Sequence, residues 1–191
     1  MQLDKIRNWL KNNLDEERYR HVLGVEQSAR ELAIMFNEDE EKAALGGLLH
    51  DTAKSIKNSE LLNIIDENNL PVSEEEKNSV KTLHSPVGAF MAENLFGIKD
   101  EEILNSIRFH TVGRINMSMI EKIVFLADKI EAETRDIAFR NKVLNEVKEK
   151  NNIDAGILIC YGATIKSLVD RKLYINNQTI EVWNFLINSL K

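Results

Sequence analysis

His50 and Asp51 place an imidazole beside a carboxylate at the end of an apolar run, and Lys54 follows within the next turn. Neighbouring residues on a helix point about 100° apart, so these two side chains do not share one face. A metal cation lying between the two directions could still be reached by both. An isolated pair of this kind is more often a cap beside a hydrogen-bonded core histidine, so the rest of the chain decides.

Further candidate ligands are spread along the chain. The sequence holds four histidines, His21, His50, His84 and His110, and each has a polar or basic residue close by. Asp128 is acidic within the otherwise apolar stretch 124–130. A buried aspartate in such a stretch is nearly always paired or bound to a metal. Imidazoles and carboxylates without a thiolate suit iron, manganese, cobalt, nickel or zinc, and ligand type alone does not choose among them.

Helices must position these residues. Apolar spacing predicts helices over 3–14, 19–36, 38–50, 58–69, 101–110, 118–130, 154–171 and 179–190. Ser73 and Ser118 are expected to cap helices, and Ser85 followed by Pro86 predicts a helix start just after His84. With only two prolines and eight glycines, and no long linker or repeat, the chain is predicted to form one compact all-α bundle.

The helix that ends at His50 is apolar almost all round, which predicts that it is buried. Its adjacent glycines, Gly46 and Gly47, lower helix propensity, so the close approach of a neighbouring backbone would explain them. A buried carboxylate at the end of such a helix is costly unless a cation compensates it. This predicts a bound metal at His50 and Asp51.

Composition limits the partners and the compartment. The 191 residues carry a net charge of −6, which argues against extended nucleic-acid binding but allows a small basic pocket for phosphates. The single Cys160 cannot form an internal disulfide, as fits a reducing cytoplasm. The N-terminus lacks a run of signal-peptide length, and no stretch approaches the roughly 20 apolar residues that cross a membrane. A cytoplasmic protein without membrane contact is expected.

Five ordered segments, 18–21, 50–54, 84–89, 110–114 and 121–131, resemble the HD-domain superfamily of metal-dependent phosphohydrolases. The most similar group is the YqeK-like family of symmetrical bis(5'-nucleosyl)-tetraphosphatases. The resemblance runs from about residue 18 to the C-terminus. It implies a single HD domain over 1–191, with a metal-binding core over about 18–135 and C-terminal helices over 154–190 packed on it.

The resemblance also implies the site residues. The primary metal ligands would be His21, His50, Asp51 and Asp128, while His84 and His110 would hold a second ion or the phosphate. Asp51, Lys54, His84 and His110 would act in catalysis. The substrate would contact Arg18, His21, Asp51, Thr52, Ala53, Lys54, His84, His110, Thr111, Gly113, Arg114, Asp128 and Arg135.

Two points stay open at this stage. Segment 111–114 could equally be a plain helix-ending turn if the resemblance is set aside. Ala132 replaces a proline of the family pattern, which makes Arg140 a rival of Arg135 as the substrate arginine. Lys129 and Glu131 are expected to pair with solvent or with neighbouring residues.

YqeK-like proteins cleave diadenosine tetraphosphate into two ADP, with iron implicated at the centre. For this chain the resemblance implies that reaction, one or two transition-metal ions, iron first among them, and no organic cofactor. Its partners would be a dinucleoside polyphosphate and the ADP product, with a homodimer left open. The alternatives are another HD nucleotide phosphohydrolase or phosphodiesterase, a metal-containing nucleotide sensor without turnover, and a scaffold whose histidines are structural.

Overall fold

Helices occupy most of the chain in the computed structural model, which describes residues 2–191. Their bounds are α1 Gln2–Asn13, α2 Glu16–Phe36, α3 Glu40–Leu49, α4 Asn58–Glu67, α5 Glu74–Asn78, the 3-10 helix η1 Val80–Thr82, α6 His84–Phe96, α7 Glu101–Phe109, α8 Met119–Ile130, α9 Ile137–Lys150, α10 Ile153–Asp170 and α11 Asn177–Ser189. No strand occurs in the described part of the chain, which confirms the predicted all-α class. Met1 of the predicted domain lies outside the described residues.

Polar caps start most of these helices. The side chains of Asp15, Asp39, Ser73, Asp100, Ser118, Asp136, Asn152 and Asn176 each accept a hydrogen bond from a backbone N–H in the first turn that follows. Such a cap stabilises a helix by about 1 kcal/mol because it satisfies an otherwise unpaired donor. The caps predicted at Ser73 and Ser118 are therefore confirmed.

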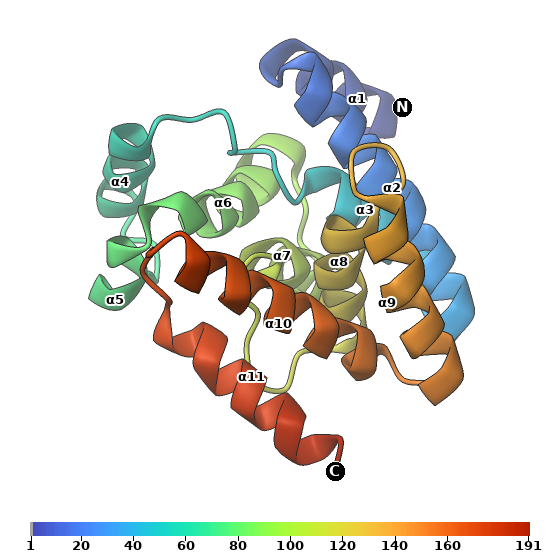
Figure 1. Ribbon diagram of the computed structural model, residues 1–191. Coiled ribbons are helices and arrows are strands. Elements are labelled where there is room, and N and C mark those ends of the chain that lie inside the picture. Colours follow the sequence, from blue (N-terminus) through green and yellow to red (C-terminus); the bar gives the residue numbers. More distant parts are fainter. Residues whose placement is uncertain (1) are drawn as a thin grey trace.

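Helix α3 packs against α2, α7 and α8, and it lies beside α2 in Figure 1. A Cβ added at Gly47 would lie 3.0 Å from the carbonyl oxygen of Val25 in α2. A side chain at this position would force one of the two backbones to shift. The predicted close approach of a backbone is confirmed at Gly47, where it fixes the end of α3 beside α2, whereas Gly46 faces the side chains of Ser106 and Val124.

Two large apolar cores lie on either side of this contact. One joins α2 and α8 to α9, α10 and α11, and the other joins α1, α2 and α3 to α6 and α7. In Figure 1, α10 and α11 lie together on one side of the bundle, where α10 packs against α8 and α9. Within residues 2–191, no helix is both long and apolar enough to span a bilayer.

Two local predictions were wrong. Helix α6 begins at His84 itself, and Ser85 does not cap it but forms a 2.6 Å hydrogen bond with the Thr111 hydroxyl. Helix α9 was not predicted, although Val143 and Val147 recur at helical spacing and are both fully buried. Most other residues of this helix are charged or polar, so its narrow apolar stripe was not recognised.

Candidate metal centre and substrate cavity

Three buried histidines are oriented by backbone carbonyls that lie just before them in the chain. The Nδ1 atoms of His50, His84 and His110 each bond the carbonyl three residues earlier, at 2.6, 2.8 and 2.8 Å. A carbonyl oxygen only accepts, so the proton lies on Nδ1, and Nε2 of a neutral ring presents a lone pair. Burial lowers the pKa of His84, and it lowers the pKa of His110 to about 3, which favours the neutral rings. Metal-bound histidines usually show this arrangement.

The fourth histidine, His21 of α2, is oriented by a carboxylate instead. Its Nδ1 lies 3.1 Å from Oε1 of Glu131, which is fully buried and also accepts from the backbone N–H groups of Glu133 and Thr134. Burial tends to raise the pKa of Glu131, but the hydrogen bonds from Thr134 and His21 lower it below the usual value. Of the two expected partners, solvent and neighbouring residues, Glu131 has the neighbouring ones, and its contact with His21 was not predicted. Its place one turn after Asp128 was the available signal.

Asp51 joins the four imidazoles into one cluster. Its Oδ2 lies 3.5 Å from Nε2 of His50 and 3.9 Å from Nε2 of His21. Its Oδ1 lies 3.2 Å from Nε2 of His84 and 3.5 Å from Nε2 of His110. The two oxygens of one carboxylate thus face two separate pairs of histidines. Each pair forms, with Asp51, a buried group of three that could hold a metal ion.

The donor atoms of this cluster fit cations. The Nε2 atoms of His21 and His50 lie 3.3 Å apart, and those of His84 and His110 lie 3.1 Å apart. Two lone pairs at such a distance repel unless a proton or a cation lies between them. Oδ1 of Asp51 is buried and has no hydrogen-bond partner among the described residues. A metal ion at each pair would satisfy these atoms together.

Asp128 of α8 closes the cluster on the other side. Its Oδ1 lies 3.1 Å from Nε2 of His21, and the side chains of Lys129 and Arg135 both donate to this carboxylate. Burial tends to raise the pKa of Asp128, but the charge of Lys129 and the His21 hydrogen bond hold it well below the usual value. The ionised carboxylate is suited to bind a metal.

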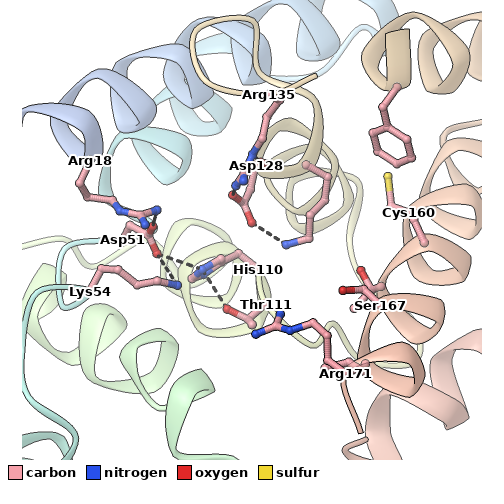
Figure 2. A pocket seen from close by; sticks show the side chains of 15 residues that line it. Arg18, Asp51, Lys54, His110, Thr111, Asp128, Arg135, Cys160, Ser167 and Arg171 are labelled. Atoms are coloured by element: carbon pink, nitrogen blue, oxygen red, sulfur yellow. Dashed lines mark hydrogen bonds and ion pairs between the residues drawn. The ribbon is translucent and has the colours of Figure 1, made fainter. Parts of the chain in front are cut away.

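A cavity of about 430 Å³, the inner cavity, opens over Asp51 and Asp128. Figure 2 shows Arg18 and Lys54 beside Asp51, Arg135 beside Asp128, and Arg171 reaching in from the opposite side. Its lining contains two carboxylates, Asp51 and Asp128, and five cations, Arg18, Lys54, Lys129, Arg135 and Arg171. The cavity therefore carries surplus positive charge in a chain whose net charge is −6. Such a cavity suits a polyanion such as a polyphosphate.

Helix α10 forms one wall of this cavity, which the sequence analysis did not predict. Cys160, Ala163, Thr164, Ser167 and Leu168 line it. These positions recur every three or four residues, so they share one helix face. A face of small and polar side chains on an otherwise apolar helix was the signal that could have indicated it.

Several predicted substrate residues do not line the inner cavity. Arg114 forms a two-pronged ion pair with Glu121, at 2.8 and 2.6 Å, and Gly113 lies in the turn before it. Thr52 donates to the carbonyl of Leu49, and Ala53 is buried in an apolar cluster. The structure does not bring Thr52, Ala53, Gly113 or Arg114 to this cavity.

The two rival arginines differ in position. Arg135 lines the inner cavity and donates to both the backbone carbonyl and the Oδ1 of Asp128. Arg140 is held away from it, where it donates to the carbonyl of Ile130 and to the hydroxyl of Ser28. The geometry favours Arg135 as the arginine that can reach a substrate.

Comparison with known proteins adds to this geometry. The family model of the HD domain matches residues 18–133, which contain all four histidines, Asp51 and Asp128. The chain belongs to the HD-domain family. The HD domain here is also 37% identical to a crystal structure from Clostridium acetobutylicum described as a predicted HD superfamily hydrolase involved in NAD metabolism. That likeness has a TM-score of 0.91 and covers 98% of this chain and 97% of the other.

Two relatives extend the match of this HD-domain protein over nearly the whole chain. A symmetrical bis(5'-nucleosyl)-tetraphosphatase of Halalkalibacterium halodurans is 35% identical over 187 residues, 98% of either chain. A protein of the same name from Staphylococcus aureus is 32% identical over 185 residues, 97% of this chain and 94% of the relative. The family predicted from five short segments is thereby confirmed.

Proposed function

We propose that this protein is a metal-dependent phosphohydrolase that cleaves diadenosine tetraphosphate symmetrically into two ADP. The observation that carries the proposal is the pairing of four Nε2 atoms around the two oxygens of Asp51, beneath a cavity with surplus positive charge. The relatives named as symmetrical bis(5'-nucleosyl)-tetraphosphatases support the choice of substrate.

The proposed metal ligands are His21, His50, Asp51 and Asp128 for one ion, with His84, His110 and Asp51 for a second. When bound, such ions polarise a phosphoryl oxygen and make water a better nucleophile. Iron is the ion we favour, a choice implied by the resemblance to the YqeK-like family rather than by the ligand types. Glu131 and the three backbone carbonyls hold the imidazoles with Nε2 directed at the centre.

The cations of the inner cavity would bind the phosphates. Arg18 lies 2.7 Å from Oδ2 of Asp51, and Nζ of Lys54 lies 3.0 Å from Nε2 of His84, so both reach the edge of the cluster. With Arg135 they would place the central anhydride over the centre and offset the charge that builds up on its oxygens. Burial is the largest influence on Lys54 and lowers its pKa.

Water would attack directly, without a covalent intermediate on the protein. Burial raises the pKa of Cys160 to about 12, so the one cysteine that lines the cavity stays a thiol and is a poor nucleophile. In the reaction, the oxygen of water bonds one central phosphorus and the bridging oxygen leaves with the other. Two ADP molecules result, and the two protons of water pass to solvent or stay on the new terminal phosphates of the ADP.

The test is product analysis. Metal-replete protein is incubated with diadenosine tetraphosphate, and the nucleotides are separated by chromatography. We expect ADP alone, two molecules for each substrate consumed. Release of AMP with ATP, or unchanged substrate, would contradict the proposal.

A competition assay with mononucleotides and phosphodiesters separates this activity from other HD hydrolases. Tight retention of ADP without product would indicate a sensor instead.

Further features stay predictions. The chain is proposed to form a single HD domain with its core over about 18–135, a view supported by the packing of α10 on α8 and α9. Binding of a small nucleotide rather than extended nucleic acid is supported by the net charge of −6. A homodimer and a cytoplasmic location are likewise predictions from the sequence.

A further inference from the structure

A second cavity adjoins the one above the metal centre. It measures about 460 Å³, and it shares Thr111, Thr164 and Leu168 with the inner cavity. We call it the outer cavity. Because the same three side chains line both spaces, the two cavities are neighbours on either side of Thr111.

The outer cavity has the surfaces of a nucleoside site. Val80, Val112 and Leu173 give it apolar walls, and the ring of Tyr174 stands at its edge with 53% of the residue exposed. Ligand sites typically combine apolar walls with a few polar groups, and bases stack readily on aromatic rings. This aromatic ring is not part of the apolar cores of the protein.

One polar group in this wall lacks a partner. Asn176 is a buried lining residue whose Oδ1 accepts from the backbone N–H of Gln178 and so caps α11. Its Nδ2 has no hydrogen-bond partner among the described residues. An unpaired buried donor is costly, and the ring nitrogens of a base are acceptors that could satisfy it.

Arg171 lines the inner cavity close to Thr111, a residue that both cavities share. Figure 2 shows its guanidinium reaching from the end of α10 toward Thr111. The other four cations of the inner cavity each lie within ion-pair distance of Asp51 or Asp128. No carboxylate partner is found for Arg171 within residues 2–191. Its charge is therefore free to bind a phosphate that lies between the two cavities.

We propose that the outer cavity binds the second nucleoside of a dinucleoside polyphosphate, while Arg171 binds the phosphates that connect it to the metal centre. This rests on the proposed function. Symmetrical cleavage places the central anhydride at the ions, so an identical half of the substrate extends to either side. The inner cavity accommodates one half along α10, and the junction at Thr111 gives the other half a path into the outer cavity.

The experiment measures binding apart from turnover. The probe is diadenosine tetraphosphate with a methylene group in place of the central bridging oxygen, which cannot be hydrolysed there. Its affinity for the metal-loaded protein is measured by calorimetry for wild type, Arg171→Gln and Tyr174→Ala. The matched controls are Lys166→Gln, which removes an exposed cation of the same helix that pairs with Asp170, and Tyr174→Phe, which keeps the ring. Thermal melts show that each variant is folded.

We expect Arg171→Gln to weaken binding about tenfold or more, the usual effect of losing a charged hydrogen bond. Tyr174→Ala should weaken it between about fivefold and a hundredfold, the range for one stacked base. Both controls should stay within about twofold of wild type on the same scale of effects.

Affinity unchanged in either Arg171→Gln or Tyr174→Ala, or lowered as much in the controls, overturns the inference. Failure of the proposed function is distinct, because the probe would then bind while wild type releases no ADP from diadenosine tetraphosphate.

Discussion

Replacing Glu131 by glutamine tests whether the buried carboxylate behind His21 prepares that imidazole for a metal. The two oxygens of Glu131 accept from His21 Nδ1, from the N–H of Glu133 and from the N–H and hydroxyl of Thr134. A glutamine has one acceptor oxygen, and its amide group would face one of these donors. We therefore expect one unsatisfied buried donor, which costs about 1–3 kcal/mol of unfolding free energy in the metal-free protein.

The larger expected effect is on metal binding. Loss of a carboxylate that orients a ligating histidine typically lowers metal affinity about 10–100-fold, equivalent to about 1.4–2.7 kcal/mol. Affinity is measured by competition with a chelator, and folding by circular dichroism. Glu133→Gln is the matched control, because this neighbouring carboxylate is more than half exposed and only weakly paired with Arg20. Unchanged metal affinity in Glu131→Gln would refute the role given to this residue.

Three further outcomes follow from the geometry. Asp51→Ala should lose both bound metal and activity, as judged by elemental analysis and ADP release; full metal content would show that Asp51 is no shared ligand. In steady-state kinetics, Arg135→Ala should raise KM about tenfold or more with a smaller change in kcat. Arg140→Ala should leave KM unchanged and lower the free energy of unfolding by about 1–3 kcal/mol, as measured by urea denaturation. The reverse pattern would exchange the roles of the two arginines. Burial lowers the pKa of His110 from 6.5 to about 3, so between these values only the unfolded chain binds this proton. The unfolding free energy of the metal-free protein should therefore fall as pH falls from 6.5 to 4.5, by up to about 1.4 kcal/mol per pH unit from this group. In urea denaturation, the unfolding free energy of His110→Gln should depend less steeply on pH. An equal dependence in both proteins would show that His110 is already charged in the fold.

The sequence indicated the residues of the candidate metal centre because each of them is a polar group in apolar surroundings. His50 and Asp51 end a helix that is apolar all round, and Asp128 interrupts another apolar run. In such surroundings a charged or polar group needs a partner, so the residue type alone is informative. The helical spacing of apolar residues likewise predicted most of the helices.

The parts that were missed depend on contacts between distant segments. Glu131 and His21 are 110 residues apart in the sequence, and no local pattern indicates that their side chains are in contact. The α10 wall depends on the packing of that helix against α8. Arg114 is the converse case, since the guanidinium predicted to contact substrate is paired with Glu121 in the fold.

The most direct test of the metal centre is the anomalous scattering of crystals of the metal-loaded protein. We expect a peak between Nε2 of His21, Nε2 of His50 and Oδ2 of Asp51. A second peak is possible between Nε2 of His84, Nε2 of His110 and Oδ1 of Asp51. The ligands should lie at the roughly 2.0–2.3 Å typical of such sites. Metal bound elsewhere, with these Nε2 atoms left uncoordinated, would contradict the proposed metal centre.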